Sequence, residues 1–174
     1  NELHNMLIQT RLQKPLLNGH PPNITDCTFD FEPIKIPTDY YSHPKFNRIL
    51  SNYVNNISNS SILFPISFLN FLDRMFLNNQ HPLLFLCGDK GHAKLLELDY
   101  ISAPHISSHG SISLMTNFHA ISHFFELNNG FSIDQKLSQS FKTQLFYKGD
   151  TPINYTKQMY NALFNGLNPG NFLP

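Results

Sequence analysis

The clearest pattern along the chain is a repeat of apolar residues at intervals of three and four positions, which is typical of an amphipathic helix. It predicts helices over residues 42–56, 66–78, 117–129 and 153–165. Pro44 stands near the start of the first helix, and Gly130 and Gly166 follow the last two. Proline at the first turn and glycine after the last turn are common helix boundaries, so the residue chemistry agrees with the periodicity.

Three shorter stretches predict strands. Leu83–Cys87 contains only apolar residues, as in a strand that is buried on both faces of a parallel sheet, and we expect it to end in a turn over Gly88–Gly91. Residues 131–133 and 141–147 alternate in polarity and predict an antiparallel strand pair. Helices that alternate with such strands favour an α/β fold.

The N-terminal region differs in composition from the rest. Residues 1–17 show a weak helical repeat, whereas residues 18–39 are rich in proline and predict an extended arm with one edge strand at residues 28–34. We therefore divide the chain into an N-terminal helix and arm, residues 1–41, and an α/β region, residues 42–174.

Charge and cysteine content exclude several classes of function. The 174 residues carry 12 basic and 12 acidic side chains, so no net positive field attracts nucleic acid. No apolar run is long enough to span a membrane. The two cysteines, Cys27 and Cys87, form no cluster, which predicts a reducing compartment, the cytoplasm. The chain begins with Asn rather than Met, and we expect it to be a fragment of a longer protein.

The turn expected at residues 88–91 is the first candidate for chemistry. Ligands of open α/β sheets bind beyond the carboxyl ends of the strands. There Asp89 could accept a ligand hydrogen bond or a proton, and Lys90 and Gly91 could contact the substrate. The alternative is an ordinary turn in which Gly and Asp serve the backbone.

A histidine-rich segment is the second candidate. His109 lies beside Gly110 and Ser111, where it could line the same pocket or simply cap the next helix. His119 and His123 have the i, i+4 spacing of a zinc-binding helix, but Ala120 stands where the metalloprotease motif has Glu. These two histidines could equally lie on the solvent face of the helix, and we expect no metal site.

Two segments of the chain resemble a known family. LLFLCGDKG at residues 83–91 and HGSISLMTNFHAISHFFELNNGF at residues 109–131 are similar to the carboxyl-terminal half of putative S-adenosylmethionine-dependent methyltransferases. These are the MidA-like group and bacterial relatives in which tetratricopeptide repeats follow the methyltransferase-like domain. IPTDYYSHPKFNRIL at residues 36–50 and the tail NALFNGLNPGNFLP show a weaker similarity.

The resemblance implies a partial Rossmann-like sheet, a transferase activity on a protein substrate, and S-adenosylmethionine as the cofactor of the intact protein. For this function we assign Asp89 and His109 as the catalytic residues, either of which could serve as the base, and we expect Asn117 to join Lys90, Gly91, Gly110 and Ser111 in binding the substrate. The glycine-rich cofactor loop of the family is missing from the sequence. We therefore expect the isolated chain to be inactive and leave its cofactor-binding residues unassigned.

The alternative function is a non-catalytic protein-binding module with a degenerate methyltransferase-like fold. In that case the partner is a protein, and a second copy of this chain is one candidate. The missing glycine-rich loop is the feature that separates the two hypotheses.

Overall fold

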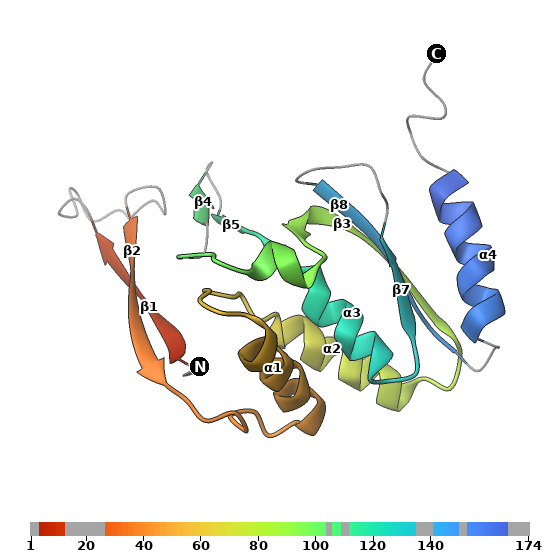
Figure 1. The fold of residues 1–174 in the computed structure, drawn as a ribbon, viewed down its shortest axis with the longest axis horizontal. Coiled ribbons are helices and arrows are strands. Elements are labelled where there is room, and N and C mark those ends of the chain that lie inside the picture. Colours follow the sequence, from red (N-terminus) through yellow and green to blue (C-terminus); the bar gives the residue numbers. More distant parts are fainter. Residues whose placement is uncertain are drawn as a thin grey trace, which may run out of the picture. The chain divides into compact units, whose positions relative to one another are not determined.

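A computed structural model describes the chain in two compact units. The first unit comprises residues 1–58 and 104–114, and the second comprises residues 59–103 and 115–174. The elements of both units are labelled in Figure 1. The residues that the structure describes are 4–12, 27–103, 106–108, 112–134, 141–149 and 153–166.

The first unit contains two strand pairs and one helix. Strands β1 (His4–Leu12) and β2 (Cys27–Lys35) pair antiparallel over nine residues each, and β4 (Ile106–Ser108) pairs with β5 (Ile112–Leu114). Helix α1 (Pro44–Asn56) begins after His43, whose Nδ1 accepts a hydrogen bond from the backbone N–H of Lys45 at 3.2 Å. Its apolar side, which includes Phe46 and Ile49, is buried.

The second unit is built on a four-stranded mixed sheet in the order β6-β3-β8-β7. Its strands are β3 (Leu83–His92), β6 (Thr116–Asn117), β7 (Phe131–Asp134) and β8 (Phe141–Lys148). Strand β8 pairs antiparallel with both β3 and β7, and the short β6 pairs parallel with the end of β3. The region therefore has a mixed α/β fold, as the sequence predicts.

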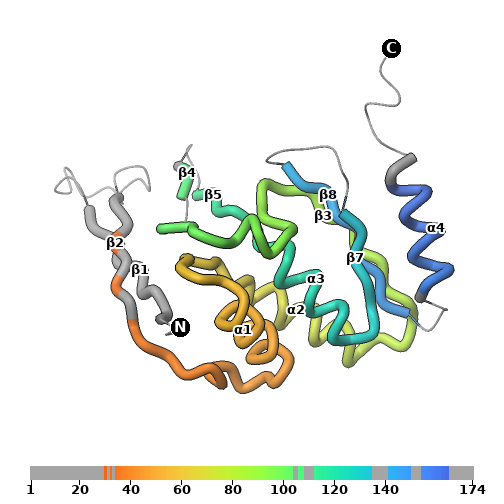
Figure 2. Tube along the Cα trace, viewed as in Figure 1, coloured from red at the N-terminus to blue at the C-terminus, as the bar shows by residue number. Residues whose placement is uncertain are grey.

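Aromatic side chains join helices α2 (Ile66–Asn78) and α3 (Phe118–Glu126) to one face of this sheet. Phe125 of α3 lies 6.0 Å from Phe85 of β3 and 5.2 Å from Phe146 of β8, measured between ring centroids. Phe76 of α2 stacks on Phe124 at 5.6 Å. The path of the chain from α2 through β3 to α3 can be followed in Figure 2. We call this side of the sheet the inner face.

Helix α4 (Ile153–Gly166) lies on the opposite, outer face of the sheet, over β7 and β8 (Figure 1). It buries Phe164 and packs Tyr160 against a cluster that comprises Phe131, Ile133, Leu145 and Tyr147. Because β7 is at the sheet edge, α4 covers the β7 side of the outer face.

Most of the predicted helices and strands are confirmed, with small shifts at their ends. The helix expected over residues 1–17 is wrong for residues 4–12, which form β1. Pairing with β2 provides backbone hydrogen bonds along this segment, and such tertiary pairing overrides a weak helical repeat. The strand expected at residues 28–34 is confirmed as β2. The division expected at residue 41 falls inside the first unit.

The description of Leu83–Gly91 from sequence is wrong in two respects. The expected turn at residues 88–91 does not form, because β3 continues to His92 and pairs Gly88, Asp89 and Lys90 with β8. The strand is also not buried on both faces, since Leu84 and Leu86 of the outer face are exposed. An apolar run without alternation carries no information about which face is covered.

Candidate functional site

The side chains of Asp89 and Asn117 lie near the junction of β3 with β6. Asp89 is exposed, and its Oδ2 accepts a hydrogen bond from the hydroxyl of Thr116 at 2.8 Å while its Oδ1 accepts one from the backbone N–H of Lys90 at 2.7 Å. The bond from Thr116 ties β3 to β6, and the bond from Lys90 lies within β3. The carboxylate therefore has a structural role, and its expected catalytic role stays a prediction.

Gly91, which follows Asp89 and Lys90 on β3, allows β6 to pack closely against this strand. Lys90 is exposed. A Cβ atom at Gly91 would overlap the backbone oxygen of Thr116 and come within 2.9 Å of the Phe118 ring. Glycine at position 91 therefore permits the close approach of β6. This is a packing reason for a residue that we expected to contact a substrate.

Asn117 is buried and serves the start of helix α3. Its Oδ1 accepts a hydrogen bond from the backbone N–H of Ala120 at 2.9 Å, and its Nδ2 donates one to the carbonyl of Leu63 at 3.1 Å. The first bond is an N-cap, and the second attaches the segment before α2 to α3. The remaining predicted site residues, His109, Gly110 and Ser111, lie outside the described residues.

The two histidines of α3 are neighbours, with ring centroids 6.3 Å apart. Burial lowers the pKa of His119, and the nearby His123 lowers it further. Within the residues that the structure describes, no group of three or more His, Cys, Asp or Glu side chains lies close enough to hold a metal ion.

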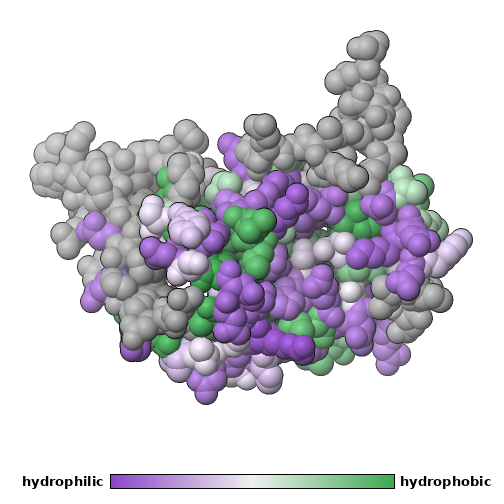
Figure 3. Space-filling model, in the orientation of Figure 1, coloured by the Kyte–Doolittle hydropathy of each residue, from purple (hydrophilic) through white to green (hydrophobic). Residues whose placement is uncertain are grey.

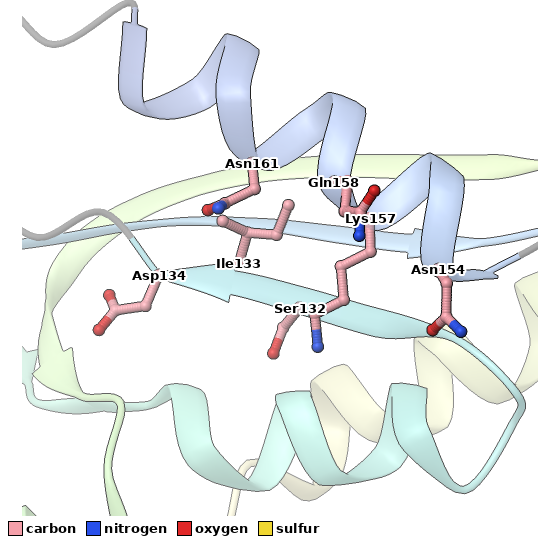
Figure 4. Close-up of a pocket in the computed structure, with 7 residues that line it drawn as sticks. All are labelled: Ser132, Ile133, Asp134, Asn154, Lys157, Gln158 and Asn161. Carbon is pink, nitrogen blue, oxygen red and sulfur yellow. The ribbon is translucent and has the colours of Figure 1, made fainter.

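A shallow pocket of about 490 Å³, lined mostly by polar residues, lies between the edge of β7 that faces away from β8 and one flank of α4. Figure 4 shows side chains of α4 pointing toward β7 across it. One carboxylate oxygen of Asp134 is buried and has no hydrogen-bond partner in the described part of the chain, and Lys157 offers an ammonium group. The lining residues are Ser132, Ile133, Asp134, Asn154, Lys157, Gln158 and Asn161. These groups can bind a polar solute, but the α4 side chains that line the pocket are all exposed.

The outer face of β3 carries a run of exposed apolar side chains. Leu84 is 47% exposed, Leu86 is 65% exposed, and Phe141, at the start of β8, is 49% exposed. Alternate residues of a strand point to the same face, so Leu84 and Leu86 are neighbours there. The Phe141 ring lies over Gly88, because a Cβ atom at Gly88 would meet it at 3.1 Å. We call Leu84, Leu86 and Phe141 the outer β3 surface.

Helix α4 extends the apolar character of this side of the second unit. Met159 and Leu163 are partly exposed and lie on the flank of α4 opposite the residues that line the polar pocket. Since the pocket is at the edge of β7 that faces away from β8, the flank with Met159 and Leu163 is the one nearer β3. On the face that Figure 3 shows, hydrophobic residues form separate areas among hydrophilic ones.

Sequence reasoning missed the outer β3 surface. The run Leu83–Cys87 was expected to be buried on both sides, and no polar alternation marks Leu84 and Leu86 as exposed. The one available signal was Gly88, whose missing side chain leaves room for the Phe141 ring.

Comparison of this chain with models of protein families, with curated proteins and with solved structures found no match. Among the described residues, none of the helices has both the length and the apolar character that crossing a membrane requires.

Proposed function

We propose that this chain is a non-catalytic protein-binding module and that it binds through the outer β3 surface. The single observation that carries the proposal is the exposure of Leu84, Leu86 and Phe141 side by side on one face of the sheet. Single exposed apolar residues are common on proteins, whereas contiguous ones mark interaction sites.

Burial of this surface would supply part of the free energy that binding requires. Full burial of a Leu or Phe side chain is favourable by about 1.5–3 kcal/mol. Each of the three side chains is roughly half exposed, so covering all of them would contribute about 3–4 kcal/mol before backbone hydrogen bonds are counted. Met159 and Leu163 of α4 would add to this if the partner reaches them.

The polar residues expected to perform catalysis support the same proposal. Asp89 hydrogen bonds to Thr116 across the β3–β6 junction, and both polar atoms of the Asn117 side chain serve α3 and the segment before α2. These contacts explain the two residues without a substrate. The methyl-transfer function rests on the sequence resemblance alone.

A degenerate Rossmann-like origin is the finer part of the proposal. Its support is the parallel pairing of β3 with β6 and the helix α3 that begins directly after β6. Parallel strands and the helices that follow them are the repeating unit of such folds. Both remaining pairs of the sheet, β3 with β8 and β8 with β7, are antiparallel.

Selection of displayed random peptides on the immobilised chain tests the proposal. We expect enrichment of peptides with apolar residues at alternate positions, and loss of their binding to the Leu86→Lys variant, because an ammonium group on the surface opposes apolar contact. Leu96→Lys is the matched control, since Leu96 is 87% exposed and lies outside the outer β3 surface. The proposal is wrong if a chain that is monomeric on the support enriches no peptide, or if the selected peptides bind the Leu86→Lys variant as well as the unchanged chain.

A further inference from the structure

The edge of β3 that faces away from β8 is open over most of its length. In the described part of the chain, no strand pairs with this edge from Leu83 to Lys90. Strand β6 occupies it only at Gly91 and His92, and Pro82 precedes its first residue. The open edge is therefore bounded by a proline at one end and by β6 at the other.

This edge lacks the features that usually prevent strand addition. Natural proteins protect exposed edges with charged side chains, prolines or bulges. Residues Leu83–Gly88 carry no charge and no proline, and Asp89 and Lys90 come only at the end. The unpaired backbone groups thus lie beside the apolar side chains of Leu84 and Leu86, a combination that favours addition of another strand.

We propose that the partner is a second copy of this chain, whose β3 pairs antiparallel with β3 about a two-fold axis at Leu86. The two four-stranded sheets then form one continuous sheet. This inference rests on the proposed function, because it identifies the protein that binds β3 beside the exposed side chains of the outer β3 surface.

The register follows from the geometry of the strand. Directly opposite residues of antiparallel strands point to the same face, whereas consecutive residues of one strand point to opposite faces. A two-fold axis normal to the sheet must therefore lie midway between the two copies of one residue. With the axis at Leu86, Leu83 lies opposite the partner's Asp89, and the pairing between the two copies ends before it reaches β6. An axis at Cys87 would place Leu83 opposite the partner's Gly91, which β6 already pairs. An axis at Phe85 would leave part of the open edge unused.

The side chains are self-complementary in this register. Leu86 lies opposite the partner's Leu86, and Leu84 lies opposite the partner's Gly88, so a large residue meets a small one. The Phe141 ring, which lies over Gly88, is then in reach of the partner's Leu84. The charged residues Asp89 and Lys90 of the two copies are at opposite ends of the pair, roughly 20 Å apart. Like charges are therefore not brought together.

Disulfide trapping tests the register. In a chain with Cys27→Ser and Cys87→Ser, a Leu86→Cys substitution places two cysteines directly opposite each other, about 4.5–5.5 Å apart between Cα atoms, which is within the range for a disulfide. Leu84→Cys in the same background is the matched control, because its two cysteines are displaced by four residues, or about 13 Å. We expect a covalent dimer from Leu86→Cys under mild oxidation and loss of that product for Leu84→Cys. Equal trapping of both variants, or of neither, overturns the inference.

The mass in solution separates this inference from the proposed function. Light scattering of the unchanged chain should give twice the 20.0 kDa of one copy, and the Leu86→Lys variant should give 20.0 kDa. If the chain stays monomeric at every concentration while its selected peptides still require Leu86, the dimer is wrong and the proposed binding module stands. A chain that neither dimerises nor selects peptides overturns both.

Discussion

The carboxylate of Glu97 connects three parts of the second unit. Its Oε1 accepts a hydrogen bond from Nζ of Lys142 at 2.9 Å, and its Oε2 accepts from the backbone N–H groups of Ala93 and Lys94 at 2.8 and 3.2 Å. Lys142 is largely buried on the inner face of β8. The pair therefore holds the 3₁₀ helix at Leu95–Leu98 against the sheet and neutralises a buried ammonium group.

Stability should depend on the ionisation of Glu97. Burial raises the pKa of this carboxyl, but the hydrogen bonds from Lys142 and from the backbone of Ala93 and Lys94 outweigh it, so its pKa is below the ordinary value. A lowered pKa contributes stability above the unfolded-state pKa, and this contribution is lost as the pH falls through the folded-state value. We expect Glu97→Gln to reduce the free energy of unfolding by about 1–2 kcal/mol at neutral pH, and by progressively less in acid.

Urea unfolding at a series of pH values measures this difference. Glu126→Gln is the control, because Glu126 is exposed on α3. A Glu97→Gln variant that is as stable as the unchanged chain at neutral pH, or that loses the same stability at every pH, contradicts the role given to the ion pair.

At the scale of elements, the start of helix α3 depends on Asn117. Asparagine is among the best N-cap residues, and here the same side chain also bonds to the carbonyl of Leu63, which is distant in sequence. One residue thus sets the boundary between β6 and α3 and attaches a second segment to it.

Asn117→Ala should lower the free energy of unfolding by about 1–2 kcal/mol, through loss of the cap and of the bond to Leu63. Asn117→Asp should lose at least as much, because its carboxylate still accepts the hydrogen bond from Ala120 but cannot donate to Leu63 and is buried beside that carbonyl oxygen. The urea midpoints of both variants measure the effect, with Asn70→Ala on the exposed side of α2 as the control. If Asn117→Ala were as stable as the unchanged chain, the side chain would be free for a ligand, as the resemblance implies.

At the scale of the whole molecule, binding of S-adenosylmethionine separates the two function hypotheses. A protein-binding module with no cofactor site should give no heat in a calorimetric titration of the full chain. Saturable binding with a dissociation constant in the micromolar range would contradict the module and favour the methyltransferase. Asp89→Ala then supplies the control, since we assigned this residue to catalysis rather than to the cofactor.

The dimer proposal belongs to the same scale. Among the described residues the sheet of the second unit has four strands, and β3, which carries the exposed Leu84 and Leu86, is open on one edge. Doubling the sheet about Leu86 would cover that edge with the most apolar strand of a second copy. This explains why an uncharged edge can persist without the usual protection.

Sequence periodicity was sufficient for the helices because each helix has its own repeat. The apolar positions of α1, α2 and α3 return every three or four residues, and residues such as Pro44 and Asn117 mark the boundaries through local backbone chemistry. The antiparallel pair β7–β8 was predictable for a similar reason, since alternation of polarity reports a strand with two different faces.

The candidate site was less predictable, because it depends on pairing between distant residues. Gly88, Asp89 and Lys90 have the composition of a turn, yet they extend a strand because residues 141–143 of β8 pair with them. The free energy of a turn preference is small and comes from a few neighbouring residues. Backbone hydrogen bonds along a whole strand and a packed aromatic core contribute more, and they come from distant segments. Residues assigned to a pocket from sequence are therefore placed on a flat strand.

The amino-acid sequence by itself determined the α/β class, the positions of four helices and the neutral charge, since these follow from periodicity and composition within short windows. Only the tertiary structure decided that β1 is a strand, that β3 runs to His92, and that Leu84, Leu86 and Phe141 share one uncovered face. The physical reason is that strand pairing and burial depend on contacts between segments far apart in the chain. The free energy of these contacts cannot be inferred from the sequence of one segment.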